Sequence, residues 1–279
     1  MSVDTTGPEL STSRTGRVGS YWQEIRGRTD ELTGYSAAPE SPADSTIHTV
    51  VDGDVVIVVA YEAIVFDMDG VLLTGYHTDR EIYRRAAQEA TTDFAIDIDE
   101  LPADLVDPDR GADIRRICDA RGVNPDAFWG YREHASTAME NEQIAEGTRE
   151  PFADTEVLFD LSDVARLGVV SNNRQGTVRF VLEHFGFVGH VDAFRGRLPT
   201  LDSFDRMKPD PAFLDTVLDA LDVDPAETLF VGDRRSDVLT ADRAGTDSAL
   251  LVRDGDPPDG NPDPTVTIGT LTELRSFVQ

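Results

Sequence analysis

The stretch that decides the fold is residues 63–70, which read Ala-Ile-Val-Phe-Asp-Met-Asp-Gly. Four consecutive apolar residues, two of them β-branched, predict a short strand that is buried on both faces of a parallel sheet. Asp67 and Asp69 follow this strand at once, and Gly70 permits a sharp turn. In isolation such a pattern serves a turn, a metal site or covalent catalysis, and these eight residues leave all three open.

Similar apolar runs recur after residue 150 and alternate with helical patterns. We expect strands near residues 63–67, 166–171, 228–232 and 248–252, and helices near residues 175–185, 210–221 and 236–244. A weaker segment at 191–195 and a strand and helix within 266–278 extend the series. Such alternation predicts an α/β fold with a Rossmann-like, three-layer core, in which helices cover both faces of a parallel sheet.

Residues 75–150 differ, because they show helical periodicity and almost no strand signal. Helices are expected at residues 79–91, 112–121 and 125–145. We interpret this segment as a helical cap inserted into a core that comprises residues 46–74 and 151–279, with a helix at 152–165 returning the chain to the core.

The segment before the core divides into two parts. Residues 46–60 contain two apolar runs around Asp-Gly-Asp, which predict a hairpin. Residues 1–45 are rich in Ser, Thr, Gly and Pro, a composition typical of a disordered extension, with one short helix expected near residues 21–32.

Polar side chains also follow two other predicted strands, namely Ser171, Asn172, Asp233 and Asp237. Lys208 is the only lysine in the chain, and it lies in the run Arg-Met-Lys-Pro-Asp-Pro just before an expected helix. Ligands of open parallel sheets bind beyond the carboxyl ends of the strands. We therefore expect these side chains to meet Asp67 and Asp69 at one edge of the sheet.

In chain order these four motifs resemble those of the haloacid dehalogenase-like hydrolase superfamily. The resemblance covers about residues 62–255 and rests on the set, since no single motif is specific. It implies that Asp67 is a nucleophile that forms an aspartyl-phosphate, and that Asp69 is a general acid and base. The acid role asks for a carboxyl group that is neutral in the first step, which neighbouring carboxylates would favour.

The resemblance also assigns the phosphate-binding residues. Ser171 would hold a phosphoryl oxygen, with Asn172 as an additional donor. Lys208 would stabilise the Asp67 carboxylate and the charge that develops on the phosphoryl group. Plainer alternatives are a polar residue that ends a strand for Ser171 and a surface side chain for Lys208.

A Mg²⁺ ion is implied as cofactor, because this ion prefers oxygen ligands. The resemblance assigns direct ligation to an Asp67 carboxylate oxygen, the backbone carbonyl of Asp69 and Asp233. Asp237 would act through water. Its alternative role is that of an ordinary acidic residue at a helix N-terminus.

Asp69 restricts which members of the superfamily the chain resembles. Halide-releasing members typically lack this acid and cation-pumping ATPases carry threonine there, so Asp69 implies phosphate-ester hydrolysis or phosphomutase chemistry. About 100 residues separate Asp69 from Ser171, whereas 37 separate Ser171 from Lys208. The cap therefore lies between the first two motifs, as in the phosphoglycolate phosphatase and β-phosphoglucomutase branch.

The expected activity is a Mg²⁺-dependent phosphatase for a small phosphorylated metabolite, such as phosphoglycolate or a sugar phosphate. A phosphomutase and a non-catalytic interaction protein that has kept the fold are the alternatives. Substrate choice would reside on the cap, where the candidates are His77, Arg110 and Gly111, each with a plainer interpretation as a loop or solvated residue. Charged residues with no assigned role are Arg115, Arg116 and Arg121, expected on a solvated helix face, and Arg234 and Arg235, beside Asp233.

Composition limits the partners and the compartment. The chain has 25 basic and 53 acidic residues and a formal charge of −28, which would repel nucleic acids and anionic membranes. Nearly all basic residues are arginine, a pattern that resembles proteins of salt-loving cells, although an ordinary acidic enzyme is the alternative. Cys118 is the single cysteine, which fits a reducing cytoplasm. We expect a cytoplasmic protein without a secretory signal or membrane span, and the sequence predicts no oligomeric state.

Overall fold

The computed structural model describes residues 46–51, 54–75, 77–98, 100–255 and 262–278, all within the unit Ser45–Gln279. The predictions for residues 1–45 lie outside the described residues. β1 (Thr46–Val51) and β2 (Asp54–Val59) pair as an antiparallel hairpin, as their sequence predicts. Within the described ranges no helix combines the length and apolarity needed to cross a membrane.

A parallel sheet of six strands lies at the centre of this unit, in the order β5-β4-β3-β6-β7-β8. Its strands are β3 (Ala63–Phe66), β4 (Arg166–Arg174), β5 (Ala193–Arg197), β6 (Thr228–Gly232), β7 (Asp247–Leu251) and β8 (Val266–Ile268). The predicted α/β class is confirmed, and β4 continues three residues beyond its expected end. Because β3 pairs with β4 on one side and β6 on the other, the carboxyl end of β3 is a topological switch point, where ligands bind in such sheets.

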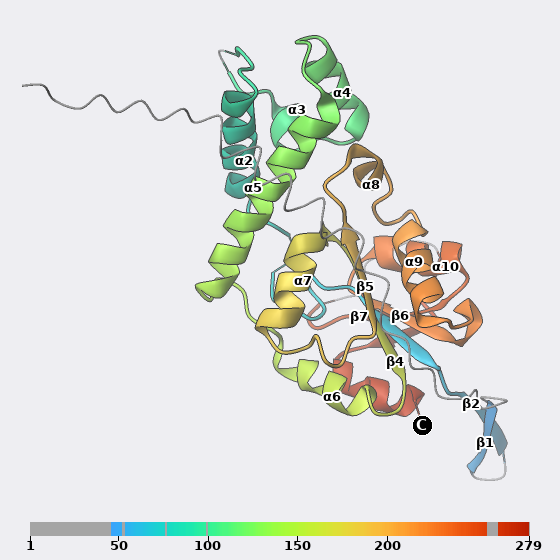
Figure 1. Cartoon of the computed structure of the whole chain (residues 1–279). Coiled ribbons are helices and arrows are strands. Elements are labelled where there is room, and N and C mark those ends of the chain that lie inside the picture. The colour runs from blue at the N-terminus through green and yellow to red at the C-terminus, as the bar shows by residue number, and fades with distance from the viewer. Residues whose placement is uncertain (1–45, 52–53, 76, 99, 256–261, 279) are drawn as a thin grey trace, which may run out of the picture. The chain divides into compact units, whose positions relative to one another are not determined.

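Helices cover both faces of the sheet (Figure 1). Alternate residues of β3 point to opposite faces, as the period of a strand requires. Ile64 and Phe66 pack with α6 (Val157–Leu161) and α7 (Gln175–His184), while Ala63 and Val65 pack with α9 (Ala212–Leu221) and α10 (Arg235–Ala244). The strand is therefore buried on both sides, and the predicted three-layer core is confirmed.

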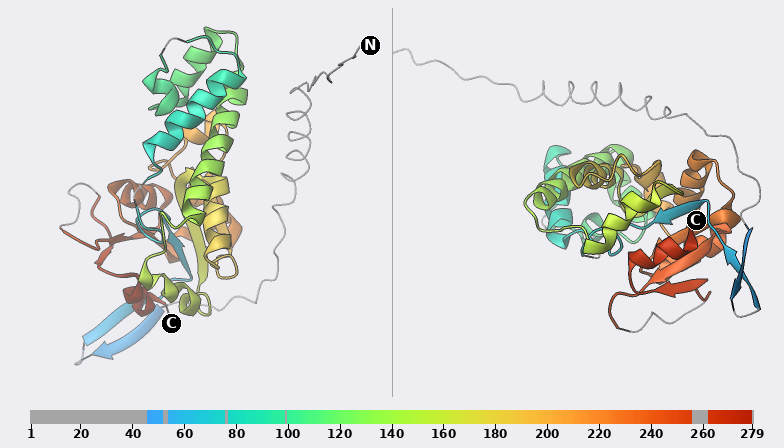
Figure 2. Two further views of the ribbon diagram at one scale, coloured as in Figure 1. Left: turned by 90° about the vertical axis from the view of Figure 1, so that its left-hand side faces the viewer. Right: turned by 90° about the horizontal axis from the view of Figure 1, so that it is seen from below.

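The cap comes between β3 and β4 in the chain and consists of α2 (Arg80–Asp93), α3 (Ala103–Val106), α4 (Gly111–Asp119) and α5 (Pro125–Ala145). It extends beyond one end of the sheet (Figure 2). The side chains of Asp79 and Asn124 accept backbone hydrogen bonds at the starts of α2 and α5 and fix where these helices begin. α3 was not predicted from sequence.

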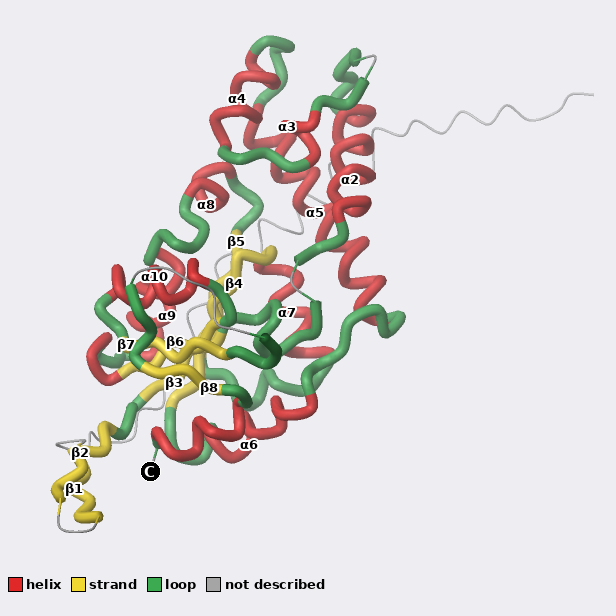
Figure 3. The backbone as a smooth tube through the Cα atoms, turned by 180° about the vertical axis from the view of Figure 1, so that it is seen from behind, coloured by secondary structure: helices red, strands yellow, loops and turns green. Residues whose placement is uncertain are grey.

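The short helix α8 (Leu201–Asp205) joins the cap to the core (Figure 3). It follows β5, yet its residues Leu201 and Phe204 belong to the apolar cluster of the cap. The ring centres of Phe204 and Trp129 are 4.8 Å apart. Asp205 accepts a hydrogen bond of 2.6 Å from the backbone N–H of Gly111. The cap therefore rests on a core element through both apolar and polar contacts.

The described part of the unit also contains three short 3₁₀ helices, namely η1 (Ala153–Glu156), η2 (Pro225–Glu227) and η3 (Leu271–Phe277). The helix expected at residues 152–165 is η1 followed by α6, and the expected C-terminal helix is η3. Asp154 in η1 ties these segments together. Its carboxylate accepts bonds of 2.8 and 2.9 Å from Arg253, one from the Thr270 hydroxyl and one from the Leu271 N–H.

We expect Asp154→Asn to lower the free energy of unfolding by about 1 kcal/mol, the lower part of the range for hydrogen bonds to charged groups, because the site is partly exposed. Burial opposes the ionised form, but the hydrogen bonds from Arg253, Leu271 and Thr270 together outweigh it and hold the pKa of Asp154 below its ordinary value of 3.8. This contribution is therefore present at neutral pH and is lost as the pH falls through the pKa of the folded state.

Urea unfolding of the parent and Asp154→Asn between about pH 7 and pH 3 measures this difference. The matched control is Asp163→Asn, at an exposed position of the same region. A difference that persists undiminished at the acid end would contradict the ionic origin of the effect.

Candidate active site

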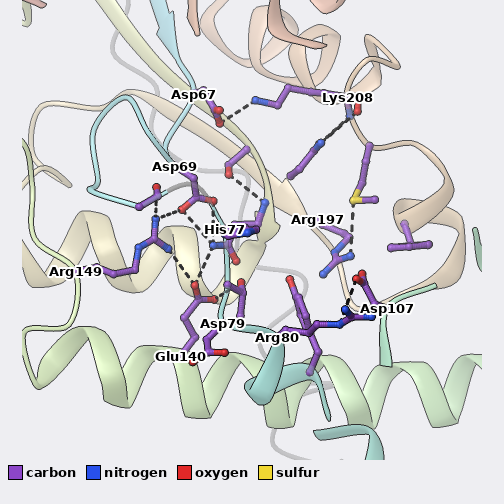
Figure 4. A pocket seen from close by; sticks show the side chains of 18 of the residues that line it. Asp67, Asp69, His77, Asp79, Arg80, Asp107, Glu140, Arg149, Arg197 and Lys208 are labelled. Atoms are coloured by element: carbon purple, nitrogen blue, oxygen red, sulfur yellow. Dashed lines mark hydrogen bonds and ion pairs between the residues drawn. The ribbon is translucent and has the colours of Figure 1, made fainter. Parts of the chain in front are cut away.

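A cavity of about 1120 Å³ lies between the carboxyl edge of the sheet and the cap (Figure 4). Six predicted site residues line it, namely Asp67, Asp69, Ser171, Asn172, Lys208 and Asp237. The seventh, Asp233, offers a carboxylate oxygen that lies within 4.8 Å of oxygens of Asp67 and Asp237. The structure therefore brings all seven residues together.

The ammonium group of Lys208 lies between two carboxylates. Its Nζ is 2.8 Å from Asp67 Oδ1 and 2.7 Å from Asp237 Oδ1, and it also donates to the Val170 carbonyl. Burial opposes the charged form of Lys208, but Asp237 and Asp67 outweigh it and raise its pKa above the ordinary value. Lys208 is 7 % exposed, so it is not a surface lysine.

Asp67 follows β3 directly and is 5 % exposed. Burial raises its pKa to about 7, although Lys208 acts in the opposite direction. Lys208 and the backbone N–H of Met68 both donate to Oδ1, the latter at 2.7 Å. Among the contacts of the described chain, these donors orient the carboxylate and leave Oδ2 for other chemistry.

Asn172 and Gly232 position this group. The Asn172 amide accepts from the backbone N–H of Lys208 at 2.7 Å and donates to its carbonyl at 3.2 Å, so Asn172 fixes the lysine backbone. A Cβ atom on Gly232 would lie 2.2 Å from Cβ of Asp237, so glycine is needed for this close approach. Asp237 Oδ2 accepts from the Arg234 N–H at the start of α10. Asp237 thus caps its helix with one oxygen and contacts Lys208 with the other.

The three clustered aspartates fit a divalent cation. Asp233 Oδ1 is buried without a hydrogen-bond partner among the described residues. Burial and then the neighbouring Asp237 raise the pKa of Asp233 to about 6. With all three carboxylates ionised, and Lys208 protonated, the group would carry a charge of −2. A negatively charged group of carboxylate oxygens is the kind of ligand set that Mg²⁺ prefers.

Asp69 is held by donors that the sequence did not reveal. Arg149 Nη2 lies 2.6 Å from Asp69 Oδ1, and the Asn173 amide donates to Oδ2 at 3.1 Å. Asp69 is therefore paired with a cation, in addition to the neighbouring carboxylate of Asp67 that we expected. Arg149 also donates to the Thr74 carbonyl at 2.7 Å, so it is fixed at the junction of cap and core.

Behind this pair, Glu140 on α5 links the cap to the sheet. Its Oε1 lies 3.1 Å from Arg149 Nη1, and its Oε2 pairs with Arg174 at the end of β4 and accepts from the Thr78 hydroxyl at 3.0 Å. Glu140 and Arg174 are each 2 % exposed. Asp69 is therefore connected to the cap through alternating acidic and basic groups.

Of the residues that the sequence suggested for substrate binding, some line the cavity and others do not. His77 lines the cavity, as does Arg234 beside Asp233. Arg110 and Gly111 are not among the described residues that line it. The Arg110 side chain is 74 % exposed, and the N–H of Gly111 is bound to Asp205. On the surface, Arg115 forms an ion pair with Asp205, and Arg116 forms ion pairs with Asp104 and Asp113.

Sequence comparisons identify proteins that are similar to this chain. A family model for haloacid dehalogenase-like hydrolases matches residues 61–245. The phosphoglycolate phosphatase of Rhodospirillum rubrum is 38 % identical over 87 residues, which are 31 % of this chain and 34 % of that protein. Pyrophosphatase PpaX of Bacillus mycoides is 33 % identical over 86 residues, which are 31 % of this chain and 38 % of that protein. The matches therefore span a little over a third of these relatives.

Solved structures share the architecture. CbbY from Rhodobacter sphaeroides in complex with phosphate is 19 % identical, with coverage of 77 % of this chain and 96 % of that chain and a TM-score of 0.54. At this identity the likeness concerns the fold. It supports the α/β core with an inserted cap.

The buried position of Lys208 makes a direct chemical test possible, because the chain has no other lysine. We expect reductive methylation of its amine in the folded protein to be slower than in the urea-unfolded protein by about tenfold or more, since reaction requires local opening. Peptide mass spectrometry measures the modified fraction. Asp237→Asn, which removes one ionic partner, should accelerate the reaction. Equal rates in folded and unfolded protein would contradict the geometry.

Proposed function

The chain belongs to the haloacid dehalogenase-like hydrolases, with its cap placed as in the phosphoglycolate phosphatase branch, and we propose that it hydrolyses a phosphate monoester of a small metabolite. The observation that carries this proposal is the Asp67 carboxylate, which lines the cavity while Lys208 holds one of its oxygens and Asp69 lies two residues away. This is an oriented nucleophile beside a second carboxyl group, the arrangement that covalent phosphoryl transfer needs.

In the first step, Asp67 Oδ2 attacks phosphorus and the bond from phosphorus to the leaving oxygen breaks. Asp69, protonated, gives its proton to that oxygen, and the alcohol leaves. In the second step, the ionised Asp69 takes a proton from the water that attacks the phosphorus of the aspartyl-phosphate, so that phosphate is released and both side chains return to their starting states. Lys208 and Ser171 stabilise the phosphoryl oxygens throughout.

The aspartate cluster would hold Mg²⁺, with ligands from Asp67, the Asp69 backbone carbonyl and Asp233, and with Asp237 acting through water. The ion supplies charge neutralisation for the phosphoryl group. Lys208 and the bound cation would then both act on the Asp67 carboxylate.

We expect the parent to release phosphate from members of a panel of phosphorylated metabolites in molar KCl with Mg²⁺, and chelation to remove this activity reversibly. Asp67→Asn should abolish release, because the amide is not a nucleophile. Asp69→Asn should reduce kcat by about 10²–10⁴-fold, the usual contribution of proton transfer.

Asp242→Asn, at an exposed position of α10, is the matched control and should retain parental rates. Isomerised product without free phosphate would indicate a mutase instead. A folded parent that turns over no member of the panel would contradict the proposed hydrolysis.

Arg149 is proposed as a positioning residue for the second step, since its guanidinium donates to the Asp69 carboxylate at 2.6 Å and aligns it for accepting a proton from water. In Arg149→Gln we expect kcat to fall by about tenfold or more and to become equal for alkyl and aryl esters, because hydrolysis of the common intermediate limits the rate. kcat/KM should change less, since it reports the first step.

Steady-state kinetics on alkyl and aryl phosphates measures both constants. Arg149→Lys should restore part of kcat, and Arg84→Gln, on the exposed face of α2, serves as the control. A parallel loss of kcat and kcat/KM would point to a purely structural role.

A further inference from the structure

The cavity contains a second charged group that the proposed chemistry does not use. Arg132 on α5 and Arg197 at the end of β5 both line the cavity, and Glu133 pairs with both of them. Glu133 Oε1 is 2.5 Å from Arg132 Nη1, and Oε2 is 2.8 Å from Arg197 Nη2. Glu133 itself is not among the cavity-lining residues of the described chain. The cations therefore face the cavity, while their shared counter-ion does not.

This group carries a surplus positive charge in a buried place. The side chains of Arg132, Glu133 and Arg197 are 2 %, 1 % and 5 % exposed. Burial opposes ionisation of Glu133, but Arg197 and Arg132 outweigh it and hold its pKa below the ordinary value. Two guanidiniums and one carboxylate sum to +1. A buried charge without full compensation is costly, so an anion in the cavity would be favoured here.

Within the described chain, both arginines keep one donor without a partner, although Arg132 Nη2 already donates to the Val106 carbonyl. Arg132 Nε and Arg197 Nε are buried without hydrogen-bond partners among the described residues. Arg197 Nη1 faces Met207 Sδ at 3.7 Å, and a thioether is a weak acceptor. The Arg132 guanidinium lies 4.6 Å from the centre of the Trp129 ring, which holds its plane in place. The donors are thus oriented before a ligand arrives.

The other ion pairs of the cavity do not offer this surplus. Arg149 and Arg174 are matched by Asp69 and Glu140, so that cluster has no net charge. Figure 4 shows Arg197 in the part of the pocket between Lys208 and the cap residues Arg80 and Asp107, away from Asp69 and Arg149. The remaining acids have roles of their own, since Asp107 pairs with Arg80 at the exposed rim and Asp79 caps α2.

We propose that Arg132 and Arg197 bind a second anionic group of the substrate, a carboxylate or a phosphate, at the end remote from the ester that is cleaved. This inference rests on the proposed phosphatase function and restricts its substrates to phosphate monoesters with a second anionic terminus. Guanidinium groups suit both anions, because their planar fork donates two parallel hydrogen bonds.

The test compares kcat/KM within matched pairs of monophosphates. One series consists of ω-hydroxy acid phosphates of increasing chain length, each paired with its neutral methyl ester. The other consists of diol bisphosphates, each paired with the ω-methoxyalkyl monophosphate. At the best-fitting chain length we expect kcat/KM of the parent to be about tenfold or more higher for the anionic member than for the neutral one. The reason is that charge-assisted hydrogen bonds contribute this much binding energy. The series with the larger ratio identifies the anion.

Variants assign the preference to residues. Arg197→Gln and Arg132→Gln should each lower the ratio of anionic to neutral substrate about tenfold, because a charged donor is lost. Glu133→Gln should keep or raise the ratio, since it removes the competing carboxylate; a merely structural role would lower turnover of both members alike. Arg116→Gln, an exposed cap arginine paired with Asp104, is the control and should keep the parental ratio.

Thermal unfolding checks that each variant is folded, and Arg132→Lys, which keeps the charge but loses the fork, should give an intermediate ratio if Arg132→Gln does not fold. Non-hydrolysable phosphonate analogues of both members, titrated by calorimetry, should show the same preference in binding. Hydrolysis of neutral esters with no preference for anionic ones, or a preference that survives in both glutamine variants, would overturn this inference alone. Preferential binding of anionic phosphonates without turnover of any ester would support it and contradict the hydrolysis.

Discussion

The arrangement of the site depends on one buried cation, the ammonium of Lys208, which is shared by Asp67 and Asp237. A buried ion costs several kcal/mol of desolvation unless partners surround it closely. Three segments that are distant in the chain must therefore converge, namely the end of β3, the loop before α9 and the first turn of α10. Asn172 and Gly232 make the convergence possible, one by fixing the lysine backbone and the other by leaving room for Asp237. The same contacts that satisfy the lysine also orient the Asp67 carboxylate.

Charge pairing also determines how the cap meets the core. Apolar packing of Phe204 against Trp129 supports the cap, and both rings line the cavity together with charged groups of the cap and the core. The pair of Arg149 with Asp69 connects the proposed acid and base to the junction of cap and core, so the position of the cap and the orientation of this carboxyl group are coupled. The group around Glu133 differs, because its charges do not cancel. In the functions that we propose, one cluster serves the chemistry and the other selects the substrate.

Much of the fold followed from local sequence patterns, because strands buried on both faces are continuous apolar runs and their carboxyl ends collect the polar motifs. The single-turn helices α3 and α8 escaped prediction, since four or five residues carry too little periodicity. Arg149 escaped for a different reason: it lies 80 residues from Asp69 in the chain, and in a sequence whose basic residues are nearly all arginine it resembles a solvated side chain. The positions of Arg132 and Arg197 in the cavity could not be predicted for the same reason. Long-range ion pairs are set by tertiary structure, which no local pattern reveals.

The central claim is that Asp67 itself takes the phosphoryl group. Its most direct test is to quench Asp69→Asn during turnover, reduce any acyl phosphate with borohydride and locate the product by peptide mass spectrometry. We predict homoserine in place of Asp67, in an amount that depends on substrate, and no such product in the Asp67→Asn protein. Phosphate release that continues without modification of Asp67, or modification of another carboxylate, would contradict the mechanism.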